Sequence, residues 1–423
     1  MSLRETRDLV ISATTPPGLA GMRVVAIMYS TYPADPRPRR AAEALTVEGA
    51  SVEVICLKEI NEEAQHEFFN GVHITRISLR HHRGGKLSYV RQYASFILLS
   101  AVILAGRAWK RRYDLVHIHN MPDVLVFSAL APKALGAKVI LDLHDPMPEL
   151  MMTIFGLRED SYWVWLLKKL EKWSIRFADA VLTANEAFKK IFSARGCPPE
   201  KISVIMNSPD EALFQYREPS SQGLGGRDTS KPFVIMYHGA LVERYGLDLA
   251  VMALGKIKES IPSAELRIYG RSTSFLERVL DSVRKSELCA AVRYLGPRKL
   301  DQIPEAIHDC DVGIIPNHKS RFTEINMPTR IFEFLSQGKP VIAPRTQGVL
   351  DYFSPQQLVF FELGDAYDLA AKMEYVFSHP HEMAGIVERG QEVYRRYKWS
   401  GERLRFVSLV EWVLSRGARS AEE

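Results

Sequence analysis

Residues 323–344, TEINMPTRIFEFLSQGKPVIAP, predict a loop, a helix and a buried strand in direct succession. Pro328 suits the first turn of the helix, where its missing N–H costs nothing. Gly338 can end the helix in a left-handed conformation, and Pro340 prevents its continuation. The apolar residues after Pro340 then predict a short buried strand. This order is typical of an α/β protein.

Glu333 lies between two phenylalanines, near the inner edge of the predicted helix. A lone carboxylate is costly in such a place unless something binds it. The alternative is a surface pair with Arg330 one turn earlier, worth a few tenths of a kcal/mol. A loop, a helix N-terminus and an inward carboxylate together suit a ligand with phosphates and a diol, so we favour a binding site.

The rest of the chain predicts an α/β fold with two Rossmann-like domains. Apolar runs alternate with helical stretches such as residues 41–49 and 247–260, which is typical of parallel sheets with both faces covered. The predicted strands are residues 22–28, 51–57, 73–77, 115–119, 138–143, 180–183 and 202–205, then 233–238, 266–269, 292–295, 312–315, 341–343 and 358–361.

The predicted domain boundaries follow a change in composition. Residues 209–231 are rich in Ser, Gly and Pro and indicate a linker. We expect a tail at 1–21, a first domain at 22–208, a second domain at 232–397, an amphipathic helix at 398–416 and a tail at 417–423.

Composition indicates an ordinary soluble protein long enough for two cores. The chain has 423 residues, of which 46% are hydrophobic and 25% charged. A net charge of +5 does not by itself indicate nucleic-acid binding. The four cysteines contain no C-x-x-C, so we expect no disulfide framework or zinc site, which suits a reducing cytoplasm. The first residues do not read as a signal peptide.

Ionisable residues follow two strands of the first domain. His144 and Asp145 come directly after strand 138–143, where open α/β sheets place ligands; a core histidine is the alternative for His144. His117 and His119 share a face of their strand and could ligate a metal, but no third ligand is evident nearby, so we expect none.

Arginines could bind anions in both domains. Arg37, Arg39 and Arg40 fall in the predicted first loop, residues 29–40, where a solvated basic run is the usual alternative. In the second domain, Arg244 lies between two glycines that allow close backbone approach, and it could neutralise a diphosphate.

The sequence resembles the retaining glycosyltransferases of family 4, which have the GT-B architecture. The likeness rests on E-x-x-x-x-G-x-P-V-I at residues 333–342. The family commonly has another Glu eight residues earlier, where this chain has Ile325. The chain is therefore more similar to the subgroup with Pro-x-(Lys/Arg)-x-x-Glu, matched by Pro328, Arg330 and Glu333.

The resemblance implies transfer of a sugar from a nucleoside diphosphate sugar with retention of configuration. It implies two domains facing across a cleft, with the donor on the second, the acceptor on the first and a last helix crossing back to the first. The implied catalytic residues are His144, Arg244 and Glu333. The implied donor-binding residues are Gly239, Arg244, Pro328, Thr329, Arg330 and Glu333, and the acceptor-side residues are Arg37, Arg40, His119, Asp123 and Asp145.

We expect no metal and no other cofactor, because Arg side chains and helix N-termini can take the leaving-group charge. The D-x-D at residues 309–311 precedes its strand, and we interpret it as chance. Two alternatives to a transferase remain open: a non-hydrolysing nucleotide-sugar epimerase and a non-catalytic partner subunit of the same fold. The sugar, the base and the acceptor, whether a glycan, a lipid-linked molecule or a small molecule, also stay open.

The segment from Arg80 to Arg112 suggests contact with a membrane. It contains a largely apolar run of thirteen residues, 94–106, flanked by basic and aromatic residues. This run is shorter than the ~20 residues that span a bilayer, so we expect no transmembrane segment but a helix that could lie in the interface. The alternative is a core helix with a solvated basic end. We therefore hypothesise a cytoplasmic protein that can rest on the inner membrane surface.

Overall fold

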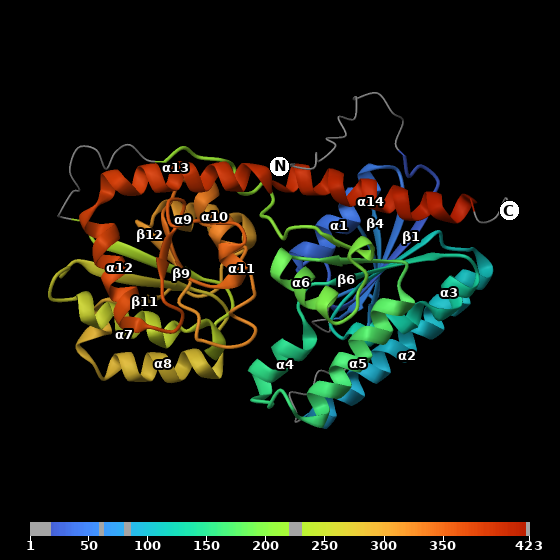
Figure 1. Cartoon of the computed structure of the whole chain (residues 1–423), viewed down its shortest axis with the longest axis horizontal. Coiled ribbons are helices and arrows are strands. Elements are labelled where there is room, and N and C mark those ends of the chain that lie inside the picture. The colour runs from blue at the N-terminus through green and yellow to red at the C-terminus, as the bar shows by residue number, and fades with distance from the viewer. Residues whose placement is uncertain (1–17, 59–62, 80–85, 220–230, 420–423) are drawn as a thin grey trace, which may run out of the picture. The chain divides into compact units, whose positions relative to one another are not determined.

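The computed structural model describes residues 18–58, 63–79, 86–219 and 231–419 (Figure 1). Most of the expected N-terminal tail, Arg80, Arg83 and residues 220–230 of the expected linker lie outside this part of the chain. The described residues form two α/β domains built on largely parallel sheets, which confirms the predicted fold class. They pack as two compact units, one from residues within 1–119, 125–140 and 406–423, the other from residues within 120–124 and 141–405.

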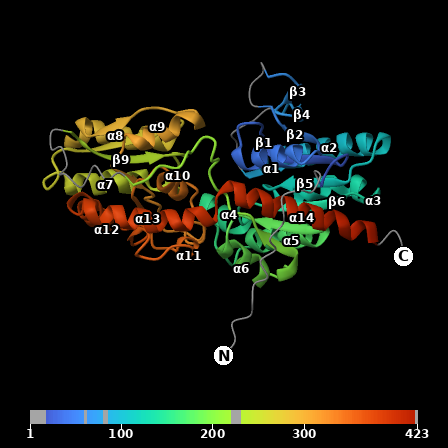
Figure 2. The ribbon, with the colours of Figure 1, turned by 90° about the horizontal axis from the view of Figure 1, so that it is seen from above.

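The first sheet has eight strands in the order β3-β4-β2-β1-β5-β6-β7-β8. Figure 2 shows β3, β4 and β2 on one side of β1. The strands are β1 (Arg23–Thr31), β2 (Ser51–Leu57), β3 (His66–Phe69), β4 (Val72–Ile77), β5 (Leu115–His119), β6 (Lys138–Leu143), β7 (Ala180–Thr183) and β8 (Ile202–Val204). The helices are α1 (Pro36–Val47), α2 (Lys86–Lys110), α3 (Leu130–Ala134), α4 (Met147–Phe155), α5 (Tyr162–Phe177) and α6 (Glu186–Ala194), with the 3-10 turns η1 (Asp123–Ala129) and η2 (Pro199–Lys201).

Two features of this region differ from the sequence-based expectation. The short strand β3, antiparallel to β4, was not predicted, because HEFF has no alternation of apolar and polar residues. Helix α1 begins at Pro36, five residues before the predicted start, since a proline fits the first turn of a helix as well as a loop. Arg37 and Arg40 are therefore helical, not in a loop, and both are buried.

The second sheet has six strands in the order β11-β10-β9-β12-β13-β14, and all of its pairings are parallel. The strands are β9 (Phe233–His238), β10 (Ala264–Tyr269), β11 (Val292–Tyr294), β12 (Val312–Ile314), β13 (Val341–Pro344) and β14 (Val359–Phe361). The helices are α7 (Leu247–Ile257), α8 (Ser274–Arg284), α9 (Ile303–His308), α10 (Arg330–Ser336), α11 (Gln347–Leu350), α12 (Ala366–Ser378), α13 (Pro380–Arg396) and α14 (Trp399–Arg419), with the 3-10 turns η4 (Glu243–Tyr245), η5 (Glu287–Ala290) and η6 (Leu300–Gln302).

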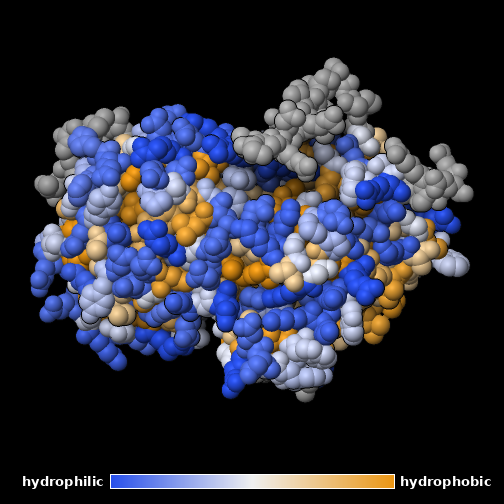
Figure 3. Space-filling model, viewed as in Figure 1, coloured by the Kyte–Doolittle hydropathy of each residue, from blue (hydrophilic) through white to orange (hydrophobic). Residues whose placement is uncertain are grey.

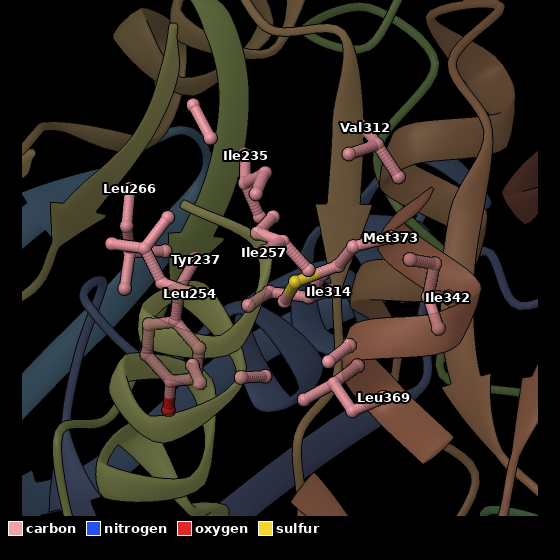
Figure 4. Packing of buried hydrophobic residues seen from close by; sticks show 14 of the residues in the cluster. Ile235, Tyr237, Leu254, Ile257, Leu266, Val312, Ile314, Ile342, Leu369 and Met373 are labelled. Carbon is pink, nitrogen blue, oxygen red and sulfur yellow. The ribbon is translucent and has the colours of Figure 1, made fainter. Parts of the chain in front are cut away.

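Alternate residues of β9 face opposite sides of this sheet. Ile235 and Tyr237 pack with α7, α8 and α12, as Figure 4 shows for Leu254, Leu369 and their neighbours. Val234 and Met236 pack with α9, α10 and α13 on the other side. Both faces are thus covered, which explains why the strands read as continuous apolar runs.

Helix α2 is longer than its apolar run indicated. It has 25 residues, and residues Val90–Lys110 are long and apolar enough to cross a membrane by length and composition alone. Gln92, Phe96, Ser100 and Leu104, spaced four residues apart, form a buried stripe. Only 28% of the membrane-length window is buried, however. Figure 3 shows hydrophobic residues in orange along the lower right edge, where Figure 1 draws α2.

Candidate active site

The carboxyl end of β9 brings a histidine against the carboxylate of Glu333. The Nε2 atom of His238 lies 3.3 Å from a carboxylate oxygen of Glu333. Burial, together with the nearby Arg330 guanidinium, lowers the pKa of His238 to about 3, so the imidazole is neutral at physiological pH. The neutral imidazole therefore lies close to the Glu333 carboxylate, and its Nε2 atom has no hydrogen-bond partner within the described residues. The Glu333 side chain keeps 13% of its surface exposed, enough for a ligand to reach it.

Arg330 crosses the glycine that follows β9. Its guanidinium donates to the carbonyl oxygen of His238 at 2.7 Å and lies 4.8 Å from the centre of the Tyr237 ring. Gly239 has φ +119°, and a Cβ there would lie 3.5 Å from the Arg330 side chain. A Cβ at that distance would make only an ordinary contact with Arg330, so glycine is needed here for the backbone conformation.

Arg244 lies on the turn η4, close to Arg330. Both arginines lie near the ring of Tyr245. The ring centre is 4.6 Å from the guanidinium carbon of Arg244 and 5.6 Å from that of Arg330. The Nε atom of Arg244 is buried and has no hydrogen-bond partner within the described chain. Gly246, with φ +64°, ends the turn and lets it approach Pro316, because a Cβ there would lie 1.9 Å from the Pro316 oxygen. Two cations thus stand together, one with an unused donor.

The predicted helix of the opening stretch is α10, which has only seven residues. Pro328 and Thr329 precede it and accept its first backbone hydrogen bonds, from Ile331 and Phe332. Gly338 follows it with φ +69°, as predicted. Because α10 is so short, its N-terminus does not by itself indicate phosphate binding. The positive charges of Arg244 and Arg330 do indicate it.

Asn120 organises the loop after β6. Its side-chain oxygen accepts from the His144 N–H at 2.7 Å. Its amide nitrogen donates to the Asp145 carbonyl and to the Asp123 carboxylate, each at 2.9 Å. The His144 ring keeps 19% of its side-chain surface exposed and lies 3.6 Å from Asp142. The predicted His144 and Asp145 are therefore held by an asparagine that sequence reasoning did not single out.

A buried cluster of charged residues interacts with Asp123, which the Asn120 side chain contacts. Arg195 pairs with Glu149 of α4 and with Glu171 of α5, the latter at 2.8 Å. Burial raises the pKa of Asp123 to about 6, although its hydrogen bond from Asn120 and the Arg195 charge act in the opposite direction. Burial also raises the pKa of Glu171 to about 8 against the pull of Arg195. At neutral pH the cluster therefore retains a proton.

The remaining predicted residues are placed as follows. His119 and Asp123 are 1% and 2% exposed, so neither lies at the surface. The described residues include one group that could hold a metal ion, His117, His119 and Asp142, whose ligand atoms all lie within 4.8 Å of one another. The expectation that no third ligand lies near the two histidines was wrong, because Asp142 comes from a different strand. Asp311 of the D-x-D at residues 309–311 accepts a hydrogen bond from the Val234 N–H at 2.7 Å, which is a structural role.

Three polar residues at the carboxyl ends of strands in the two sheets were not singled out from the sequence. They are Asn120, His238 and Asn317, which is fully buried and has no hydrogen-bond partner for its amide within the described chain. Each one closely follows or ends a predicted strand. Polar residues at the carboxyl ends of parallel strands are the signal that could have identified them.

Both halves of the chain match known families. Residues 34–208 match the model described as "Glycosyl transferase 4-like domain", and residues 226–393 match "Glycosyl transferases group 1". The chain is 24% identical over 255 residues to the probable glycosyltransferase WbjE of Pseudomonas aeruginosa, across 59% of this chain and 61% of that protein. The chain thus spans less than two thirds of that relative's length.

Solved structures share the fold. The sucrose-phosphate synthase of Thermosynechococcus elongatus has a TM-score of 0.75 at 16% identity, with 93% of this chain and 100% of that chain covered. HepE of Anabaena, solved in complex with UDP-glucose, has a TM-score of 0.67 at 15% identity, with 92% and 99% covered. At these identities the likeness concerns the fold alone.

Proposed function

Because the chain joins a glycosyl transferase 4-like domain to a glycosyl transferases group 1 domain in a GT-B fold, we propose that it transfers a sugar from a nucleoside diphosphate sugar to an acceptor with retention of configuration. The observation that carries the proposal is the group at the end of β9. There a carboxylate 3.3 Å from a neutral histidine shares helix α10 with Arg330, and Arg330 and Arg244 both approach the ring of Tyr245. A ribose diol and a diphosphate need these two kinds of partner.

Glu333 is the proposed partner of the ribose hydroxyls. A carboxylate accepts two hydrogen bonds, and neighbouring hydroxyls can donate both. His238 supports this role because it lies beside Glu333 and is neutral, so it leaves the charge of the carboxylate to a ligand. Pro328 and Thr329 hold the start of the helix that carries Glu333.

Arg244 and Arg330 are the proposed partners of the diphosphate. The unused Nε donor of Arg244 supports this role, since a buried donor without a partner is costly until a ligand satisfies it. A guanidinium pair can take the charge that develops on a leaving diphosphate, so we propose that turnover needs no metal. Because His117, His119 and Asp142 could hold a metal ion, the metal requirement of turnover must be measured.

His144 is the proposed contact to the transferred sugar. The Asn120 hydrogen bonds hold the backbone on both sides of it, and a part of its ring is exposed. Arg37, Arg40, His119, Asp123 and Asp145 are the proposed acceptor-side residues, either by contact or by supporting the loop. HepE is described in complex with UDP-glucose, so uridine nucleotides are the first donors to test.

A panel of nucleotides and nucleotide sugars in a thermal-shift assay tests the proposal. A ligand at about 100 times its dissociation constant adds ~2.7 kcal/mol to the free energy of unfolding. Product anomers identified by NMR then test retention. If no nucleotide shifts the unfolding temperature, the proposed donor site is wrong. If a donor sugar is converted without any acceptor, the protein is an epimerase.

We further propose that the protein works at the cytoplasmic face of a membrane, on a lipid-linked or polysaccharide acceptor. The exposed side of α2 supports this: Leu98, Val102 and Trp109 are 65%, 64% and 83% exposed. Lys110, Arg111 and Arg112 follow at its end and are also exposed. An apolar helix face ending in cations suits an anionic bilayer surface. Leu98→Ser/Val102→Ser should therefore lower binding to vesicles, and unchanged binding would contradict this role of α2.

A further inference from the structure

Helix α5 exposes a stripe of aromatic and basic residues along its whole length. Tyr162, Trp165, Lys169, Lys172 and Arg176, at the helical spacing of three and four residues, are all exposed. The rings of Tyr162 and Trp165 stack with centres 5.6 Å apart, and the Lys169 ammonium lies 5.6 Å from the centre of the Trp165 ring. Three of these side chains therefore contact one another on the outer face of the helix.

The composition of α5 is unusual for a solvent-facing helix. Trp163, Trp165 and Trp173 are 56%, 52% and 55% exposed, and they make up three of the chain's six tryptophans. The only acidic residue of α5, Glu171, is fully buried and pairs with Arg195. The outer face of the helix thus combines aromatic rings with positive charge alone.

We infer that this face of α5 binds the surface of an anionic lipid membrane. Tryptophan and tyrosine rings prefer the headgroup region, where the ring is shielded and its polar atom stays wet. Basic side chains between them meet the lipid phosphates. With 16 residues and a rise of ~1.5 Å per residue, α5 is too short to span a bilayer and lies along its surface.

Other partners fit this face less well. A second copy of the chain would have to bury Lys169, Lys172 and Arg176 in an interface to which this face of α5 brings no acidic side chain, since Glu171 is buried. A neutral glycan would use the rings but leave the three cations without partners. An anionic bilayer satisfies both kinds of side chain at once.

This inference rests on the proposed membrane attachment and adds a second contact face to it; loss of binding in the α2 variant Leu98→Ser/Val102→Ser and in the α5 variants is measured separately, so the failure of one can be told from the failure of the other. Residues on α5 therefore contribute to membrane affinity independently of α2.

Sedimentation of the full chain with phosphatidylcholine vesicles, with or without phosphatidylglycerol, tests the inference. Each cation near an anionic surface changes the partition coefficient about fivefold, so Lys169→Gln/Lys172→Gln should lower it about 25-fold on the anionic vesicles at low salt. Trp165→Ser/Trp173→Ser should lower binding to the same vesicles and reduce quenching of tryptophan fluorescence by brominated lipid. All these side chains are exposed, so the variants should fold.

Arg278→Gln on α8, combined with Lys285→Gln at the position directly after that helix, is the matched control, since it removes the same charge from another exposed region. It should leave binding within about twofold of the unchanged protein, because those cations face solvent. Equal losses in both double variants would show a general charge effect and overturn the inference. So would α5 variants that bind vesicles normally, or tryptophan variants that lose affinity for a soluble glycan but not for lipid.

Discussion

Replacing Asn120 by alanine should both destabilise the protein and slow its reaction. The side chain is 7% exposed and makes three hydrogen bonds, two of which hold the backbone of His144 and Asp145. Each contributes about 1 kcal/mol net, so the free energy of unfolding should fall by about 3 kcal/mol. The reaction should slow as well, because a displacement of about 1 Å near the reacting atoms costs about 100-fold in turnover.

Urea unfolding and initial rates on the same preparations measure the two effects. Ser128→Ala is the control, since Ser128 is buried nearby in sequence and makes one hydrogen bond, to the Leu125 carbonyl at 2.7 Å. It should lose about 1 kcal/mol and keep its turnover. Asn120→Asp keeps the shape but cannot donate, and it should do no better than alanine beside the Asp123 carboxyl. If Asn120→Ala loses stability but keeps its turnover and donor KM, Asn120 does not position His144.

Four further predictions concern the proposed chemistry and the buried cluster. Glu333→Gln should fold normally and lose at least about tenfold in nucleotide affinity, because hydrogen bonds to a charged group contribute about 1.5–3 kcal/mol; equal affinity in calorimetry would remove the role of Glu333. His144→Ala should lower kcat far more than donor affinity, and a change in donor KM alone would make it a binding residue. Turnover should survive EDTA, and activity lost to chelator but restored by manganese or magnesium would falsify the metal-free proposal. Because burial raises the pKa of Glu171 to about 8, the folded state keeps a proton that the unfolded chain releases, and the free energy of unfolding should fall as pH rises from about 5 through 8. Glu171→Gln should flatten that pH profile, and an unchanged slope would assign the proton elsewhere.

The strands of both sheets except β3 were predictable, because most of them are compact apolar runs. The helix boundaries were less predictable. The start of α1 was misplaced because a proline at Pro36 is compatible with a loop and with a first helical turn. The length of α2 was underestimated because the helix continues through Arg107, whose guanidinium is satisfied by Glu53 and Thr75 from other strands. Such long-range partners are invisible in a hydrophobicity pattern.

The same limit applies to the candidate site. His144 and Glu333 could be singled out from their positions at a strand end and beside a glycine turn. Asn120 and His238 also lie at strand ends, but their roles could not be predicted, because each matters through a partner far away in the sequence. Asn120 contacts a residue 24 positions on, and Glu333 contacts His238 across 95. Only the assembled sheets bring these pairs together.

Arg244 and Arg330, whose guanidinium groups both lie near the ring of Tyr245, affect the measured stability and donor KM of the purified protein. Fixed positive charges held close together attract small polyvalent anions from solution. Phosphate, sulfate or citrate in a purification buffer would therefore settle beside Arg244 and Arg330 and raise the melting temperature. The same ions would compete with a donor sugar nucleotide and inflate its apparent KM. Preparations in a zwitterionic buffer should look less stable and bind donor more tightly.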